Sequence, residues 1–295
     1  MSLAEAITRR RGGDWHGSWG SFAAPGHSPR DRGCTVRDAP GAPDNVLYHS
    51  FNGADPLALK DEDRRAGILP AFNGSQRQPT VIDHAAAEQA RKAKDLRRQA
   101  MRRLALEVAT ETQPVWGTLV EPYLREQRGV DIPTDADRVL RFHPACMFGE
   151  GVRLPSMVAI MRDPITGKFS GIHRTAIDEG GRKVGRKMLG DPGAIMLTHS
   201  ADVTTGLGVC EGIEDGLALL QAGFAPVWAM ATAGGIKRLP ALPGIEALTI
   251  FADHDDAGID AGRHCARQWA DAGKEVALRI PDTPGADWAD TWRHR

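Results

Sequence analysis

Acidic residues follow three of the apolar segments in the last hundred residues, where strands are expected to end. Glu211 comes directly after the first such segment, Asp253 and Asp255 follow the third, and Asp287 and Asp290 lie beyond the fourth. In an open parallel sheet the carboxyl ends of the strands meet at one edge, so these side chains are expected to share one crevice. Carboxylates forced together repel one another unless a cation compensates. Mg²⁺ suits such a cluster because it takes carboxylate oxygens and shares substrate phosphates.

Each acidic motif has a plainer interpretation when it is taken alone. A Glu-Gly pair at a strand end is often only a turn, and an Asp-x-Asp sequence is common on surfaces. Their joint occurrence at strand ends, in this order, favours a metal site. Gly212 and Gly258 would let the backbone turn sharply beside the ion. Glu214 and Asp256 flank the motifs and are interpreted as neighbours without a role.

The elements that must position these acids alternate between strand and helix, which is the signature of a parallel α/β sheet. The predicted elements are strands at 207–210, 226–230, 247–252 and 275–280, and helices at 214–222 and 259–272.

A basic segment precedes this sheet, on predicted strands and turns that include a hairpin turn at Asp163–Gly167. Such cations are suited to a triphosphate or a template backbone, since arginine gives bidentate phosphate contacts. The alternative is a solvated basic turn. The candidate nucleotide- or nucleic-acid-binding residues are His173, Arg174, Arg182, Lys183, Arg186 and Lys187.

The first half of the chain has a different pattern. Residues 12–56 are rich in Gly, Pro, Trp and His, with strands predicted near 34–36 and 46–48, which is typical of a small β-rich module. A polar linker is predicted at 73–79, followed by a basic helix from an N-cap at Asp83 to about Val108. That helix is either a solvated basic surface or a DNA-binding element. A shorter helix is predicted over 115–127.

The composition, with 41% hydrophobic and 25% charged residues, is that of a soluble globular protein. No apolar run approaches the roughly 20 residues that cross a bilayer, and no stretch resembles a signal peptide, so a cytoplasmic protein is expected. The net charge of −1 hides separate acidic and basic stretches. The four cysteines form no CxxC pair, and three of them, in or next to apolar runs, are expected to be small buried residues.

The two acidic motifs resemble the signature motifs of the Toprim domain, which bacterial primases, topoisomerases and some nucleases and repair proteins share. The resemblance rests on Glu211-Gly-Ile-Glu-Asp215 and on Asp253-His-Asp255 followed by Gly258. The stretch Pro284–Asp290 is similar to a third, looser acidic element of the primase branch. The resemblance implies catalytic metal-site carboxylates at Glu211, Asp253 and Asp255, a supporting acid at Asp215 and a further metal ligand at Asp287.

The similarity extends from about Val115 to Trp292 and is closest to primase-like Toprim proteins of plasmids and phages. The segments with counterparts there are Phe142–Pro144, Pro155–Ala159 and the stretch from Gly171–Arg174 through Leu189–Gly190.

The N-terminal region looks like the small zinc ribbon that precedes such catalytic cores, with its metal ligands lost. Ala24, Ser50 and Ala54 stand where the family pattern has cysteines, and only His27 remains. One histidine cannot make a four-coordinate structural zinc site. No zinc is therefore expected. The less favoured alternative is that His16 and His49 act as substitute zinc ligands. The side chains expected to pack in place of the ion are Trp15, Trp19, Phe22 and Phe51.

The predicted fold class is α/β: a Toprim-type parallel sheet domain preceded by a mixed α+β basic subdomain and a small β-rich degenerate zinc-ribbon module. The expected domains are the ribbon-like module at 1–72, a linker and basic helix at 73–113, the basic subdomain at 114–200 and the Toprim domain at 201–295.

The resemblance implies a primase-like nucleotidyltransferase in DNA replication that acts on single-stranded DNA and nucleotides with Mg²⁺ or Mn²⁺. A Toprim nuclease, or a non-catalytic nucleic-acid-binding accessory protein of a mobile genetic element, is the alternative. There is no GxxxxGK[ST] sequence, so any replicative helicase would be a separate partner.

Overall fold

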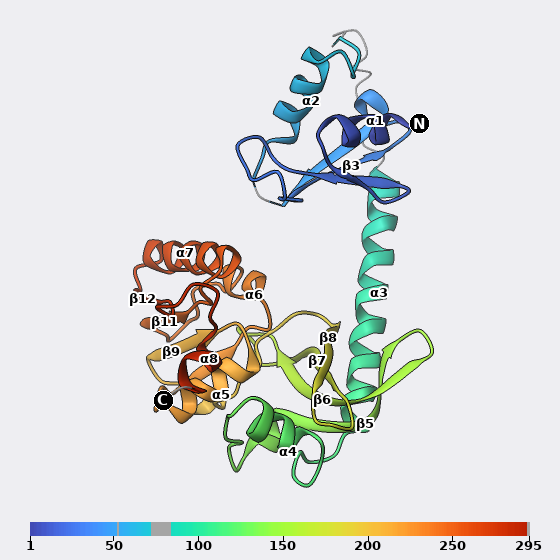
Figure 1. Cartoon of the computed structure of the whole chain (residues 1–295). Coiled ribbons are helices and arrows are strands. Elements are labelled where there is room, and N and C mark those ends of the chain that lie inside the picture. Colours follow the sequence, from blue (N-terminus) through green and yellow to red (C-terminus); the bar gives the residue numbers. More distant parts are fainter. Residues whose placement is uncertain (52, 72–83, 294–295) are drawn as a thin grey trace. The chain divides into compact units, whose positions relative to one another are not determined.

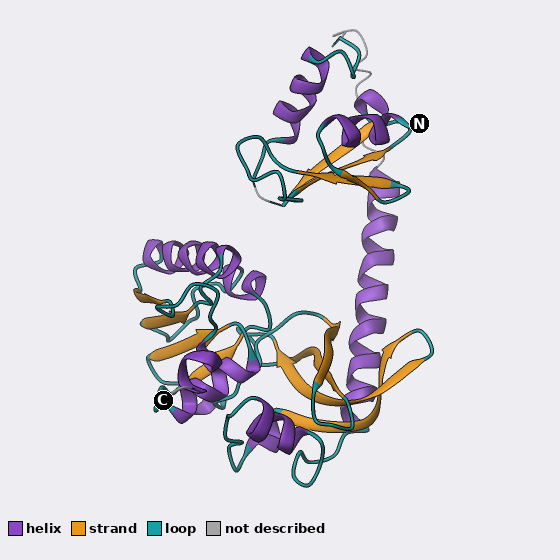
Figure 2. Cartoon of the chain, in the orientation of Figure 1, coloured by secondary structure: helices purple, strands orange, loops and turns teal. Residues whose placement is uncertain are grey.

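The computed structural model describes residues 1–51, 53–71 and 84–293, and only the backbone of Pro43, residues 84–87 and residues 292–293. The chain divides into two compact units, Met1–Asp83 and His84–Arg295 (Figures 1 and 2). The predicted linker at 73–79 and the predicted N-cap at Asp83 lie outside the described residues. No helix in the described part of the chain is long and apolar enough to cross a membrane.

The N-terminal unit is built on an antiparallel sheet in the order β1-β2-β3-β4. Side chains alternate between the two faces of a strand, so Phe22, Val36 and Tyr48 lie on the same face of this sheet. There they pack with Ile7 of the first helix and form the core. Two helices were missed by the sequence analysis, and Ser2 and Asp55 cap their N-termini. The elements are α1 Leu3–Arg10, β1 Asp14–Trp15, β2 Trp19–Phe22, β3 Cys34–Asp38, β4 Val46–Ser50 and α2 Pro56–Arg65.

Two of the four aromatic residues expected in the place of a zinc ion are not in the core. Phe22 is fully buried and Trp15 packs against the core, but Trp19 is 40% exposed and Phe51 74% exposed. The prediction is wrong for these two because Trp19 lies three residues from Phe22, on the opposite face of β2, and Phe51 follows the end of β4. His27 pairs with Asp31 at 3.3 Å.

The middle of the chain forms a second antiparallel sheet, in the order β5-β6-β7-β8, beside a long helix. The last turns of that helix pack on one face of the sheet, where Ala105 and Val108 meet Val158 and Ile172. The predicted hairpin turn is present, with the Asp163 carboxylate accepting the N–H of Thr166 at 2.7 Å. The elements are α3 His84–Thr110, β5 Leu140–Gly149, β6 Val152–Arg162, β7 Phe169–Ile177 and β8 Lys183–Gly190.

The helix predicted over 115–127 is present only in its second half. The helical turn α4 spans Val120–Pro122 and continues as a π-helical turn over Tyr123–Gln127. Gly117 adopts a left-handed backbone with φ of +71°, which ends any helix there and turns the preceding residues into a loop.

The C-terminal sheet is parallel, in the order β10-β9-β11-β12, and all four of its strands were predicted. Its core continues into the middle of the chain, since Leu217 and Phe251 share one cluster with Tyr123 and Met157. This common core fixes the two sheets relative to each other. The short helices α6 and α8 were missed. The elements are β9 Gly206–Cys210, α5 Ile213–Gln221, β10 Val227–Ala229, α6 Ala233–Lys237, β11 Ala247–Phe251, α7 Asp256–Asp271, β12 Glu275–Arg279 and α8 Trp288–Arg293.

Candidate metal and phosphate site

The carboxyl edge of the parallel sheet carries Glu211 and Asp253. Strands β9 and β11 are neighbours, and their last residues, Cys210 and Phe251, are paired in the register. Both acids therefore leave the sheet at nearly the same level. Asp255 caps helix α7 and accepts the Gly258 N–H at 2.6 Å.

Gly258 is required by the close approach of the backbone, and not by the sharp turn that the sequence analysis expected. A Cβ at Gly258 would lie 2.7 Å from the carbonyl oxygen of Asp253. The absence of a side chain therefore lets the first turn of α7 pack against the loop that carries Asp253 and Asp255.

Asp253 is the most electrostatically strained of these acids. Burial, followed by the charges of Asp215, Glu211, Asp287 and Asp255, raises its pKa to about 8. Its Oδ1 atom is buried and has no hydrogen-bond partner in the described structure. A carboxylate among other carboxylates, with an unused oxygen, is a position that a cation would stabilise.

Glu211 lies between this acidic group and a cation from the antiparallel sheet. Burial raises its pKa, the guanidinium of Arg186 opposes that rise, and Asp255 adds to it. The backbone N–H of Ala233, at the start of α6, also favours the charged form of Glu211. The structure therefore places Arg186 of β8 close enough to act on the charge of Glu211.

Asp215 has the geometry of a supporting acid. It is buried, one of its oxygens accepts the Gly212 N–H at 3.0 Å, and the other accepts the Ala289 N–H at 2.9 Å. It thus joins the start of α5 to α8. Burial and the neighbouring Asp287 raise its pKa to about 7. A Cβ at Gly212 would lie 2.3 Å from an Asp215 oxygen, so this contact requires glycine.

Asp287 also contacts a cation that the sequence analysis did not single out. Arg128, which follows the π-helical turn, lies 3.5 Å from an Asp287 oxygen. The charges of Glu214, Asp287 and Asp215 all stabilise the charged form of Arg128. This arginine therefore belongs to the electrostatic surroundings of the acidic edge.

Glu214, which the sequence analysis had treated as a neighbour without a role, is central to the contact between the two sheets. Its carboxylate accepts a hydrogen bond from the Tyr123 hydroxyl. Burial alone would raise the pKa of Glu214, but the Tyr123 bond and the charges of Lys183 and Arg128 lower it overall. The EGIED spacing places this residue on α5, but only the fold shows that Tyr123, 91 positions earlier, is its partner.

His173, of the predicted basic set, is neutral at physiological pH. It is 7% exposed, and its Nδ1 atom has no hydrogen-bond partner in the described structure. Burial lowers its pKa to about 4, with Glu214 opposing and nearby Arg186 adding to the shift. His173 therefore contributes a polar side chain beside the acidic edge and no positive charge.

The remaining predicted cations do not share one surface. In the β7–β8 register Arg174 is opposite Lys187, whereas His173 is opposite Met188, so the two pairs point to opposite faces. Arg174 is buried and donates to the carbonyls of Met147 and Met188, and Lys187 donates to the carbonyl of Phe148 at 2.6 Å. They line a hollow of 360 Å³ on the face that α3 covers. Arg182 pairs with Asp178 within its own turn at 3.0 Å.

The donor chemistry at the acidic edge fits a hard divalent cation such as Mg²⁺, because its acids offer carboxylate oxygens and Oδ1 of Asp253 has no hydrogen-bond partner among the described residues. Within residues 1–51, 53–71 and 84–293, no three His, Cys, Asp or Glu side chains are already grouped so that they could hold an ion.

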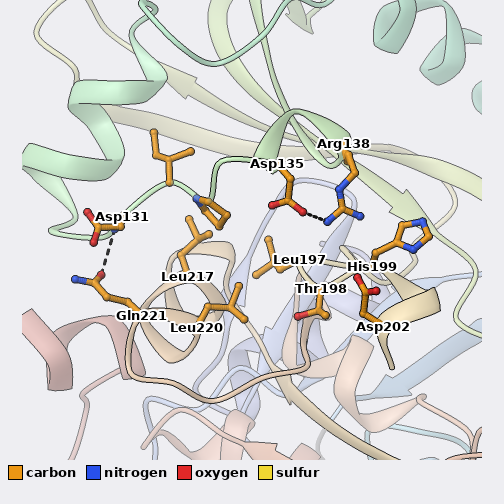
Figure 3. Close-up of a pocket in the computed structure, with 12 residues that line it drawn as sticks. Asp131, Asp135, Arg138, Leu197, Thr198, His199, Asp202, Leu217, Leu220 and Gln221 are labelled. Carbon is orange, nitrogen blue, oxygen red and sulfur yellow. Dashed lines mark hydrogen bonds and ion pairs between the residues drawn. The ribbon is translucent and has the colours of Figure 1, made fainter. Parts of the chain in front are cut away.

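A larger hollow, of 470 Å³, lies away from these acids (Figure 3). It is formed by the loop after the π-helical turn, the last turns of α5 and residues 197–202, and Figure 3 shows Asp135 paired with Arg138 at its rim. None of the predicted metal-site carboxylates lines it.

Comparison with known families decides the nature of the C-terminal sheet. A family model described as the Toprim domain matches residues 206–295. The C-terminal part of the chain is a Toprim domain. A second family model, described as a domain of unknown function (DUF7146), matches residues 99–198, which include the β5–β8 sheet. The predicted Toprim-type fold is thereby confirmed.

Solved structures of primases are similar to this Toprim protein in fold. The Aquifex aeolicus primase, with its zinc-binding and RNA polymerase domains, has 16% identity and a TM-score of 0.48 over 100% of this chain and 80% of that one. A DnaG primase catalytic domain bound to single-stranded DNA has 17% identity and a TM-score of 0.46 over 67% and 76% of the two chains. The E. coli primase catalytic core has 18% identity and a TM-score of 0.45 over 67% and 75%. No curated protein matches the sequence.

Proposed function

We propose that this Toprim protein is a primase-like nucleotidyltransferase that acts on single-stranded DNA with Mg²⁺ or Mn²⁺. The observation that carries the proposal is the charge arrangement at one edge of the Toprim sheet. Glu211 and Asp253, whose pKa values are raised by burial and by neighbouring charges, lie beside a sheet that brings Arg186 to Glu211 and Lys183 to Glu214. Acids that need a cation and cations that suit phosphate therefore meet in one place.

Glu211, Asp253 and Asp255 would hold the ion, with Asp287 as a further ligand. When bound, Mg²⁺ or Mn²⁺ would neutralise charge on the transferring phosphate and favour the deprotonated form of an attacking hydroxyl. Asp215 would position α5 and α8 around the site through its two backbone hydrogen bonds.

Arg186 and Lys183 would orient the triphosphate, since phosphoryl transfer depends mostly on positioning and charge compensation. His173, being neutral and having an unused ring nitrogen, would offer a hydrogen bond and no charge. Arg174, Lys187 and Arg182 already contact protein groups, so the proposed nucleotide site does not include them.

The test is primer synthesis on single-stranded DNA with labelled nucleotides and Mg²⁺ or Mn²⁺. Asp253→Asn is compared with Asp260→Asn, a matched change at an exposed position of α7. Short products made by the wild type and by Asp260→Asn, and lost in Asp253→Asn, are the expected result.

Two other outcomes would replace the proposal. Metal-dependent cleavage of the input strand, lost in Asp253→Asn, would establish a Toprim nuclease at the same carboxylates. An intact strand without products, bound equally well by wild type and variant, would leave an accessory DNA-binding protein. A replicative helicase and other proteins of a mobile element would be sought as partners only after primer synthesis has been observed.

A further inference from the structure

The N-terminal half of α3 is rich in basic side chains. All side chains from Glu88 to Gln99 are exposed, and burial begins only at Ala100. Seven cations follow one another on this part of the helix and just beyond it. They are Arg91, Lys92, Lys94, Arg97, Arg98, Arg102 and Arg103.

Some of these cations have partners in the protein. Lys92 pairs with Glu88 at 2.7 Å, and Arg98 pairs with Asp191, which follows β8, at 2.7 Å. Among the side chains that the structure describes, no carboxylate forms an ion pair with Arg91 or Lys94. The helix thus presents positive charge to solvent.

The free cations form a stripe with Arg98. Arg91, Lys94 and Arg98 are three and four residues apart, so they lie on one side of the helix, about 4.5–6 Å apart along its axis. Two turns after Arg98, Ala105 continues the same line and packs on the β5–β8 sheet. The stripe therefore extends outward from the face of the sheet that α3 covers.

Arg91 and Lys94 are like charges about one turn apart, and Asp95 is the acid nearest to them along this part of the helix. Like charges at these spacings destabilise a helix by about 0.2–0.5 kcal/mol per pair, and a polyanion would relieve that repulsion. A row of cations at regular intervals is complementary to a repeating anion, the phosphate backbone, better than to a single carboxylate.

We propose that Arg91 and Lys94, at the outer end of this stripe, bind the phosphate backbone of single-stranded DNA. This inference rests on the proposed function, because it assigns the stripe to the strand on which the Toprim site acts. It resolves the open choice between a solvated surface and a DNA-binding helix in favour of the second.

The test uses the full chain and a labelled oligothymidylate of about 20 nucleotides, with fluorescence anisotropy measured over a range of salt concentrations. Arg91→Gln/Lys94→Gln is compared with Arg263→Gln/Arg267→Gln. The control removes two exposed cations of α7, which also lie about one turn apart. Glutamine keeps the helix propensity of both residue types, and circular dichroism verifies the helix content.

Each phosphate contact contributes about 0.7 to the slope of log K against log salt for a single strand. The α3 variant should therefore lose up to about 1.4 of that slope and bind on the order of 10-fold more weakly near 0.1 M salt. The α7 variant should bind like the wild type. An α3 variant with wild-type affinity and slope, or equal losses in both variants, would overturn the inference.

Failure of this inference can be told apart from failure of the proposed function. If the wild type makes primers and the α3 variant binds DNA normally, the proposed function holds and the proposed role of the stripe is wrong. If the α3 variant loses DNA binding and the wild type makes no primers, the role of the stripe holds and the proposed nucleotidyltransferase activity is wrong.

Discussion

Replacing Asp253 by asparagine should stabilise the metal-free protein at alkaline pH and abolish its stabilisation by Mg²⁺. The pKa of Asp253 is raised from 3.8 to about 8. A carboxyl group with a raised pKa contributes stability that is fully present below its ordinary pKa and is lost as the pH rises through the raised value. The wild-type Toprim domain, without metal, should therefore lose stability between about pH 4 and pH 8.

The size of the effect follows from the shift. Each pKa unit corresponds to about 1.4 kcal/mol, so four units set an upper limit of about 5–6 kcal/mol. Partial exposure of Asp253 and relaxation of its neighbours reduce this, and we expect about 2–4 kcal/mol at about pH 8.5. Asparagine carries no charge, so the variant should keep that stability. Mg²⁺ at ten times its dissociation constant should add about 1.4 kcal/mol to the wild type only.

Hydrogen exchange of α5 and α7, followed by mass spectrometry with EDTA or with Mg²⁺, measures the stability of the Toprim domain separately from the N-terminal unit. Asp260→Asn is the control. The reasoning would be refuted by an Asp253→Asn protein that is no more protected than the wild type in EDTA at about pH 8.5. Equal stabilisation of both proteins by Mg²⁺ would refute it as well.

Three further substitutions test contacts that position the site or hold the N-terminal unit. Glu214→Gln removes the charged acceptor of the Tyr123 hydrogen bond and should cost about 2–3 kcal/mol in urea unfolding near neutral pH. Because folding lowers the pKa of Glu214, this difference should shrink as the pH falls below about 4.5, and a constant difference would contradict the assignment. Gly258→Ala brings a methyl group to 2.7 Å from the Asp253 carbonyl oxygen and should destabilise the Toprim domain by about 1–3 kcal/mol, with weaker protection by Mg²⁺ in hydrogen exchange. Tyr48→Phe removes a buried 2.5 Å hydrogen bond to Asp63 and should lower the stability of the N-terminal unit by about 1.5–3 kcal/mol in thermal unfolding, while α5 and α7 keep wild-type exchange.

The Toprim sheet was predictable because its signals are local. Each of its strands is a short apolar run followed by a turn, and the carboxyl ends of parallel strands meet at one edge whatever the rest of the fold does. Glu211 and Asp253 could therefore be placed together from the sequence, whereas the close approach at Gly258 became visible only in the structure. The short helices α6 and α8 carry too few residues for a helical pattern to be visible.

The partners of the acids depend on tertiary structure. Tyr123, Arg128 and Arg186 reach the acidic edge because the antiparallel sheet and the Toprim sheet share one core, and no spacing along the chain reports that packing. The sequence showed that basic residues cluster before the Toprim domain. The pairing of β7 with β8 decided that Arg174 and Lys187 point away from the face that carries His173.

By itself the sequence determined the fold class, the order of the Toprim strands along the chain and the identity of the acids at their ends, because these follow from periodicity and from strand polarity. Only the tertiary structure decided which cations face those acids, that Glu214 is buried against Tyr123, and that Trp19 and Phe51 stay outside the N-terminal core. The physical reason is that strand register and packing between sheets join residues that are far apart in the chain. A side chain's charge state and partners depend on those neighbours more than on its own sequence motif.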